Sequence, residues 1–383
     1  MAASPSLAAQ IELSLVASDI QFFGRLAQPG LHEDFRGIGF LALMPFLSAV
    51  VVETAGYLQS RGAPLTIPLQ HEALLRASRL RLKLLDDDQR TFDAILGEAG
   101  QMASVASGFM TGMHRGFGMW KRLFQADLGL YLIDGLLVCS THVAILNLGL
   151  RPTSQVFAGD GHTLGGVGQY MSAVAVSIGE FIGFVSSAIG IDLSPVTSPQ
   201  TNSPFKSRDA FSGPFYRAVA QRIAPRDKAV SLLVSILASE LNVGRVLAPL
   251  ASALVDTPLT GFKIRFLSCY HVASSLQKLL DRDYRQPFLL GHAAAALRST
   301  LQPAEVRLLR RLTGLRNTFM HYRVEADAAA LLQADIPFNG LCEAYGRSFR
   351  QVDESLTVAE QQMSGMLANL LAEALSKSAP APR

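Results

Sequence analysis

The chain has 383 residues, enough for two ordinary domains, and with 49% hydrophobic and 17% charged residues it is more apolar than a typical soluble domain. Its three cysteines lie far apart without a C-x-x-C spacing, which argues against a disulfide framework and a zinc site, so no metal or cofactor is expected. Residues 1–204 carry 12 Lys and Arg against 16 Asp and Glu, a net charge of −4. Residues 205–383 carry 22 against 15, a net charge of +7 that suits a polyanionic partner.

Residues 1–192 are predicted to form a hydrophobic helical domain whose role the sequence leaves open. Amphipathic patterns predict helices over residues 70–85 and 89–96, separated by a turn at the three aspartates 86–88. Three apolar stretches approach the length of a membrane span: residues 37–58, 128–150 and 171–191. Each has ionisable or helix-breaking residues near its middle: Pro45 and Glu53, Asp134 and His142, and Glu180, respectively. Because charges are costly inside a membrane, we expect buried helices in a cytoplasmic protein, with membrane association as the alternative.

A Ser/Pro-rich linker is predicted over residues 193–213, and a disordered tail over residues 379–383. Between them, apolar residues at helical spacing predict a bundle over residues 214–378, which makes the expected fold class all-α. Its expected helices cover residues 229–241, 243–255, 261–282, 288–300, 304–322 and 348–375. No alternating strand pattern competes in this half.

The run Arg316-Asn317-Thr318-Phe319-Met320-His321 places a permanent cation, an amide and a titratable imidazole within a turn and a half of the helix predicted over residues 304–322. An Arg can hold a phosphate with two parallel donors, and a His can accept or give a proton near neutral pH. Asn317 and His321 lie four residues apart and so project from one helical face, with Arg316 beside it. These groups suffice to cleave RNA without a metal ion.

This pattern resembles the R-x4-6-H signature of the HEPN superfamily, whose members are all-α ribonuclease and nucleic-acid-binding domains of toxin–antitoxin, abortive-infection and RNA-guided defence systems. Residues 262–276 also look like an early bundle helix of such domains, and the resemblance covers roughly residues 225–378. Arg25 with His32 and Arg285 with His292 fit the same spacing, but a proline interrupts each. The resemblance concerns the C-terminal half only.

The resemblance implies metal-independent cleavage of RNA to 2′,3′-cyclic phosphate ends, by a toxin or defence effector. His321 would be the general base or acid, Arg316 would stabilise charge that develops on the phosphate, and Asn317 would orient the imidazole or the phosphate by hydrogen bonding. Both Arg316 and His321 are expected to be exposed at a cleft between two copies of the motif, which implies a homodimer. An antitoxin or regulatory partner is a further expectation. The residues expected to support the site are Thr313, Tyr322 and His271, although a His on an apolar-faced helix such as His271 is more often a core or interface residue than a catalyst.

Basic residues cluster around the motif, and their expected partner is the RNA backbone. They are Arg307, Arg310, Arg311 and Arg323. Arg310 and Arg311 precede Arg316 by one to two turns of the predicted helix, so RNA could follow that helix toward His321. Alternatively these arginines are an ordinary solvated surface that pairs with acids such as Glu305 or Asp353.

Three functions therefore stay open. The first is the HEPN-type endoribonuclease. The second is a non-catalytic HEPN-like module that binds RNA or a protein. The third is a membrane-associated helical protein in which the Arg–His spacing is incidental.

Overall fold

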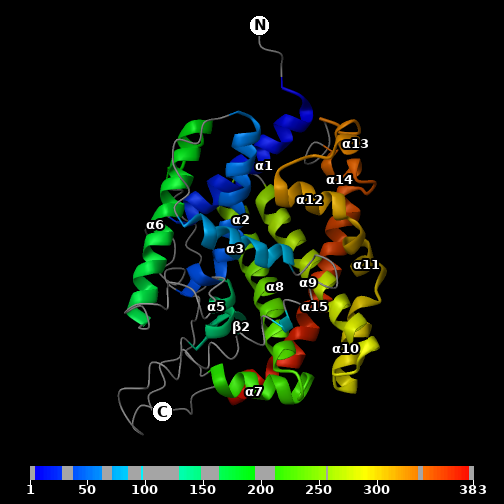
Figure 1. Ribbon diagram of the computed structural model, residues 1–383. Helices are drawn as coiled ribbons and strands as arrows, with labels where there is room; N and C mark the ends of the chain where they lie inside the picture. The colour runs from blue at the N-terminus through cyan, green and yellow to red at the C-terminus, as the bar shows by residue number, and fades with distance from the viewer. Residues whose placement is uncertain are drawn as a thin grey trace.

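The computed structural model describes residues 5–27, 38–62, 71–84, 96–97, 129–147, 164–194, 212–255, 258–334 and 340–378. The regular elements among these residues are helices, apart from one two-stranded hairpin, which confirms the all-α class (Figure 1). The elements are α1 (Leu7–Leu26), α2 (Ile38–Ser60), α3 (Glu72–Leu84), β1 (Leu130–Ile133), β2 (Leu136–Ser140), α5 (Thr141–Asn147), α6 (Leu164–Ile189), α7 (Ser212–Ile223), α8 (Lys228–Leu254), α9 (Leu259–Arg285), α10 (Gly291–Leu301), α11 (Ala304–Arg311), α12 (Thr313–His321), α13 (Ala326–Ala329), α14 (Leu341–Ala344) and α15 (Phe349–Lys377).

Most of the predicted helices are confirmed. Those expected over residues 37–58, 70–85, 171–191, 261–282, 288–300 and 348–375 correspond to α2, α3, α6, α9, α10 and α15. Helix α15 begins where it was expected: Ser348 and Gln351 form a reciprocal capping box, which satisfies backbone N–H groups at the N-terminal end of the helix. The helix predicted over residues 89–96, the tail 379–383 and most of the linker 193–213 lie outside the described residues.

The prediction of one long helix over residues 128–150 is wrong. Its described part is the antiparallel hairpin of β1 and β2, followed by the short helix α5. Asp134 and Gly135 form the turn with φ angles of 50° and 80°, the backbone that an Asp-Gly hairpin turn requires. The apolar run misled because almost every residue of both strands is buried, so no apolar–polar alternation appears in the sequence.

The two helices predicted over residues 229–241 and 243–255 are a single helix, α8. The residue between them, Asn242, does not break it, because its side chain donates to the Leu137 carbonyl of β2 at 3.0 Å. Ser239 of α8 donates similarly to the Val138 carbonyl. These two polar residues of α8 therefore donate to backbone carbonyls of the buried hairpin.

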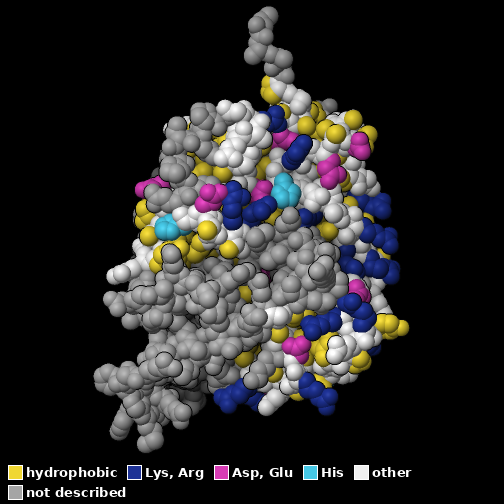
Figure 2. Space-filling view, in the orientation of Figure 1, with side chains coloured by type: hydrophobic (Ala, Val, Ile, Leu, Met, Phe, Trp, Pro, Cys, Tyr) yellow, Lys and Arg dark blue, Asp and Glu magenta, His cyan; other side chains and the backbone are white. Residues whose placement is uncertain are grey.

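The helix predicted over residues 304–322 is also wrong, because it breaks at Leu312 (φ −84°, ψ 47°) into α11 and α12. The break lets Gly314 pass the ring of Tyr345 so closely that a Cβ there would lie 2.5 Å from it. Figure 1 shows α12 turning away from α11, and Figure 2 shows Lys and Arg side chains gathered along the edge where α11 lies. Basic residues of α11 and the Arg–His motif are therefore on different helices.

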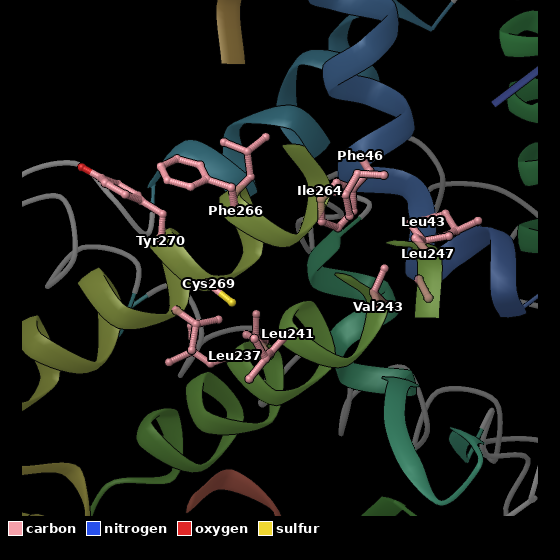
Figure 3. Packing of buried hydrophobic residues seen from close by; sticks show 14 of the residues in the cluster. Leu43, Phe46, Leu237, Leu241, Val243, Leu247, Ile264, Phe266, Cys269 and Tyr270 are labelled. Carbon is pink, nitrogen blue, oxygen red and sulfur yellow. The ribbon is translucent and has the colours of Figure 1, made fainter. Parts of the chain in front are cut away.

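A continuous cluster of buried apolar side chains includes residues from both sides of the predicted linker. Helices α8 and α9 pack against each other in the body of the molecule. Figure 3 shows Leu43 and Phe46 of α2 beside Leu247 of α8 and Ile264 of α9. The first helices are thus packed directly on the C-terminal bundle, and this contact positions the site below.

Among the described residues, three helical segments are long and apolar enough to cross a membrane, judged by length and composition: Phe40–Ser60 in α2, Gln169–Ile189 in α6 and Ala229–Leu254 in α8. In α2 and α8, 83% of the most apolar window is buried inside the protein, whereas in α6 only 33% is buried. The membrane-associated alternative therefore concerns α6 first, the helix along one edge of the molecule in Figure 1.

Candidate functional site

Helix α12 carries the Arg–His motif and ends in a strained residue. Tyr322, which follows His321, has a left-handed backbone (φ 49°, ψ 37°), which costs a bulky residue about 1–3 kcal/mol. Its ring is buried, and its hydroxyl donates to Asp19 Oδ2 of α1 at 2.6 Å. This anchor holds the strained turn and so fixes the end of α12 on which His321 sits.

Asp19 is the centre of a buried polar network that joins α1 to α9. It pairs with the Lys263 ammonium, and it accepts a hydrogen bond from Thr260 Oγ1 at 2.9 Å. The ammonium lies 4.1 Å from the centre of the Tyr322 ring, a cation–π contact. Burial, followed by the negative charge of Asp19, raises the pKa of Tyr322 well above 10, so its hydroxyl stays a donor.

His321 lies beside a carboxylate and a guanidinium from the N-terminal half. Its Nδ1 is 3.0 Å from Oε2 of Glu53 in α2, and Arg79 of α3 pairs with the same carboxylate. An Nη atom of Arg79 is 3.4 Å from His321 Nδ1. The side chains of His321, Glu53 and Arg79 are 34%, 12% and 15% exposed, so the imidazole is the accessible member of the cluster. Figure 2 shows histidine side chains among acidic and basic ones on this face.

The Glu53 contact has a chemical consequence for His321. A carboxylate only accepts hydrogen bonds, so Nδ1 of His321 carries a proton when it bonds to Glu53. The lone pair of the neutral ring is then on Nε2, which makes no hydrogen bond to the described residues. The Glu53 carboxylate is shared between this ring and the Arg79 guanidinium, which lies 3.4 Å from Nδ1. The arrangement therefore leaves Nε2 as the basic nitrogen of a neutral ring that is partly exposed.

Arg316 does not join this cluster at the surface. It is 5% exposed, so the expectation that both motif residues are exposed is wrong for Arg316. Its Nη1 donates to Asn317 Oδ1 at 3.0 Å, and Asn317 Nδ2 donates to Glu325 at 3.4 Å. Arg316 thus orders the face of α12 that Asn317 and His321 share, without being accessible to a phosphate.

The interior neighbour of Arg316 is His271 of α9. His271 is fully buried, and its Nδ1 lies 3.0 Å from Oε1 of Glu240 in α8. Burial and then the Arg316 charge hold the pKa of His271 well below 6.5, so its ring is neutral. Of the other residues expected to support the site, Thr313 contacts the Tyr270 hydroxyl at 3.1 Å, and Tyr322 anchors α12 as described above. These residues support the packing of α12.

The predicted RNA-binding arginines divide into two kinds. Arg307 and Arg311 on α11 and Arg323 after α12 are exposed, and none forms an ion pair with a residue in the described ranges. Arg310 is half-buried: its Nη1 donates to Gln277 at 2.9 Å, and burial lowers its pKa. Asp353, a suggested partner, pairs instead with Arg265.

Sequence reasoning missed Glu53 and Arg79 as site residues. Glu53 was noticed only as the carboxylate within an apolar stretch, and that isolation was the available indication of a special role. No comparable feature of the sequence distinguished Arg79.

Within the described part of the chain, no group of three or more His, Cys, Asp or Glu residues is placed to hold a metal ion. No protein-family model, curated protein or solved structure matches the chain.

Proposed function

We propose that the chain is a metal-independent endoribonuclease in which His321 is the general base. The supporting observation is the contact between His321 Nδ1 and Glu53 at 3.0 Å, with the ring about one-third exposed. That contact leaves Nε2 as the basic nitrogen, as an acid–base catalyst requires. The resemblance of the Arg316–His321 run to the HEPN signature supports RNA as the substrate.

In the proposed reaction, Nε2 of His321 takes the proton from a ribose 2′-hydroxyl. The 2′-oxygen attacks the adjacent phosphorus, the bond from phosphorus to the 5′-oxygen breaks, and a 2′,3′-cyclic phosphate forms. The departing 5′-oxygen receives a proton from an imidazolium. Glu53 stabilises the protonated ring, and general acid–base catalysis of this kind contributes about 10²–10⁴-fold in rate.

The cations take roles that fit their burial. Arg79 lies beside the imidazole and carries positive charge at the edge where a phosphate would approach. The exposed arginines Arg307, Arg311 and Arg323 are the proposed contacts to the RNA backbone. Arg316 is assigned to ordering Asn317, in place of the phosphate contact that the resemblance implies.

The resemblance further implies that two motifs face each other in a homodimer, and the second His321 would then supply the proton to the 5′-oxygen. We propose a homodimer in the cytoplasm on this basis, with an antitoxin or regulatory protein as a further partner. Membrane association through α6 is the alternative, and a carbonate wash of cell membranes separates the two: protein that stays with the membrane pellet contradicts the cytoplasmic proposal.

The test is cleavage of end-labelled RNA by the purified full-length chain in EDTA. Wild-type protein should yield 2′,3′-cyclic phosphate ends, His321→Gln should yield none, and Glu53→Gln should reduce kcat by about 10²-fold or more. A deoxyribose at the scissile nucleotide should block cleavage. Arg350→Gln, which removes a surface charge that pairs with Glu354 within α15, is the control and should cleave normally.

A second candidate is an RNA-binding or protein-interaction module without catalysis. The burial of Arg316 favours it, because the cation of the motif is not at the surface. Wild-type protein that binds RNA but leaves every RNA intact would replace the ribonuclease by this module. Cleavage by His321→Gln at the wild-type rate would refute the assigned base.

A further inference from the structure

An open groove lies between α10 and α15, beside the last turn of α7, and shares no residue with the His321 cluster. Its volume is about 530 Å³, within the range of sites that hold small molecules. Its polar lining includes Arg222, His292, Thr300, Gln362 and Asn369. No carboxylate is among the described residues that line it. The lining thus offers one cation and several neutral hydrogen-bonding groups.

Gly365 lines this groove in the middle of α15, where a glycine costs about 0.5–1 kcal/mol relative to alanine. Packing does not explain it, because a Cβ at Gly365 would meet nothing within 4 Å. At Gly261 of α9, by contrast, a Cβ would lie 3.0 Å from the Ala248 carbonyl, so close helix packing requires glycine there. The surface of α15 is therefore open to the groove at Gly365, and a side chain much larger than a methyl group there would occupy the groove.

The chemistry of the side chains that line the groove indicates which class of ligand it could bind. Arg222 donates from Nη1 to Glu373 at 2.8 Å, and its Nε hydrogen has no acceptor among the described residues. A phosphate oxygen that enters the groove could accept this donor after a small rotation of the side chain. The carboxamides of Gln362 and Asn369 each pair a donor with an acceptor, the combination that complements the edge of adenine.

We propose that the groove between α10 and α15 binds a nucleoside monophosphate, with its phosphate at Arg222 and its base against the carboxamides of α15. Arg222 is the one Lys or Arg among the described lining residues and also pairs with Glu373, so the groove offers a contact to one phosphate group and not to a polyphosphate chain. The ligand is either a free nucleotide or the terminal nucleotide of a longer strand, since both present the same group. This site is independent of RNA cleavage at His321.

Isothermal titration of the full chain with AMP tests the site. Gly365→Leu fills the groove and should weaken AMP binding at least tenfold, whereas Gly365→Ala should change the affinity by less than about threefold. Gly365→Leu should fold normally, because its side chain enters open space and leucine favours helix. Gly179→Leu, at an open glycine of α6, is the matched control and should bind AMP like the wild type.

Two further arms test the assigned contacts. Arg222→Gln should weaken AMP but leave adenosine unchanged, and a terminally phosphorylated dinucleotide that binds as well as AMP would identify the strand end as the source. The proposal is overturned if AMP, GMP, CMP and UMP all fail to bind at millimolar concentration, or if Gly365→Leu binds AMP like the wild type. Equal affinity for adenosine and AMP would overturn the phosphate contact. These results do not depend on whether His321 cleaves RNA.

Discussion

Replacing Asp19 by Asn should destabilise the fold by about 3–5 kcal/mol, because it leaves a buried ammonium without its counter-charge. Asp19 is 2% exposed and pairs with the Lys263 ammonium, which is nearly as buried. Asparagine keeps the size of the side chain and one acceptor oxygen, which can take the place of one of the two oxygens that accept from Thr260 and from Tyr322. The change therefore removes the charge and one acceptor while it keeps the shape.

Urea unfolding followed by far-ultraviolet circular dichroism measures the loss. With a slope of about 3 kcal/mol per molar urea, a loss of 3–5 kcal/mol lowers the midpoint by about 1 M or more. Asp19→Asn/Lys263→Met removes the stranded ammonium and should regain most of the stability. A single variant that loses less than about 1 kcal/mol, or a double variant no more stable than the single one, would refute the reasoning. Arg350→Gln is the surface control and should leave the midpoint unchanged.

Three other predictions concern a buried group, a close contact and the basic surface. The stability of the wild type should fall as the pH drops below about 6.5, because the imidazole of His271 takes up a proton in the unfolded chain but not in the folded one. His271 alone should contribute a loss of up to about 1.4 kcal/mol per pH unit. In His271→Gln, the urea midpoint should therefore depend less on pH between about pH 5 and 7. Gly314→Ala should destabilise the fold by about 1–3 kcal/mol, because the added methyl group would meet the Tyr345 ring, whereas Gly365→Ala should stabilise the fold. Melting temperatures that shift in the same direction in both variants would contradict the packing argument. RNA-binding isotherms at several salt concentrations give the slope of log affinity against log salt concentration. Arg307→Ala and Arg311→Ala should each reduce this slope by about one unit, whereas Arg310→Ala should not, because Arg310 is already bonded to Gln277. An unchanged slope in all three variants would mean that these arginines are only a solvated surface.

The sequence predicted helices well where one face of the helix is buried. Helices α9, α10 and α15 follow from apolar residues at helical spacing, and the Ser348 cap marks the start of α15. The hairpin was missed because both faces of its strands are buried, although Asp134 and Gly135 were a usable turn pattern. The break at Leu312 could not be predicted from local propensity, because it depends on the contact between Gly314 and the distant Tyr345.

Helix geometry explains why the exposure of His321 was predicted correctly and the exposure of Arg316 was not. Residues five apart on an α-helix are rotated by about 140°, so Arg316 and His321 cannot both face one cleft on a straight helix. Asn317 and His321, four apart, can share a face. With His321 at the surface, Arg316 therefore points into the bundle, where it lies near His271. The spacing identified the helix and the histidine but not which of the two charged groups reaches the solvent.

Helices α1 and α2 both position His321, and no pattern in the sequence of the C-terminal half could predict these contacts. Asp19 of α1 anchors Tyr322 and so fixes the backbone next to His321, while Glu53 of α2 bonds to the imidazole itself. Residues 214–378 contain the whole Arg–His motif but neither of these two carboxylates. The protonation state and orientation of His321 therefore depend on packing between segments more than two hundred residues apart in the chain. A change that loosens α1 or α2 from the bundle would alter the chemistry of His321 while leaving the motif intact.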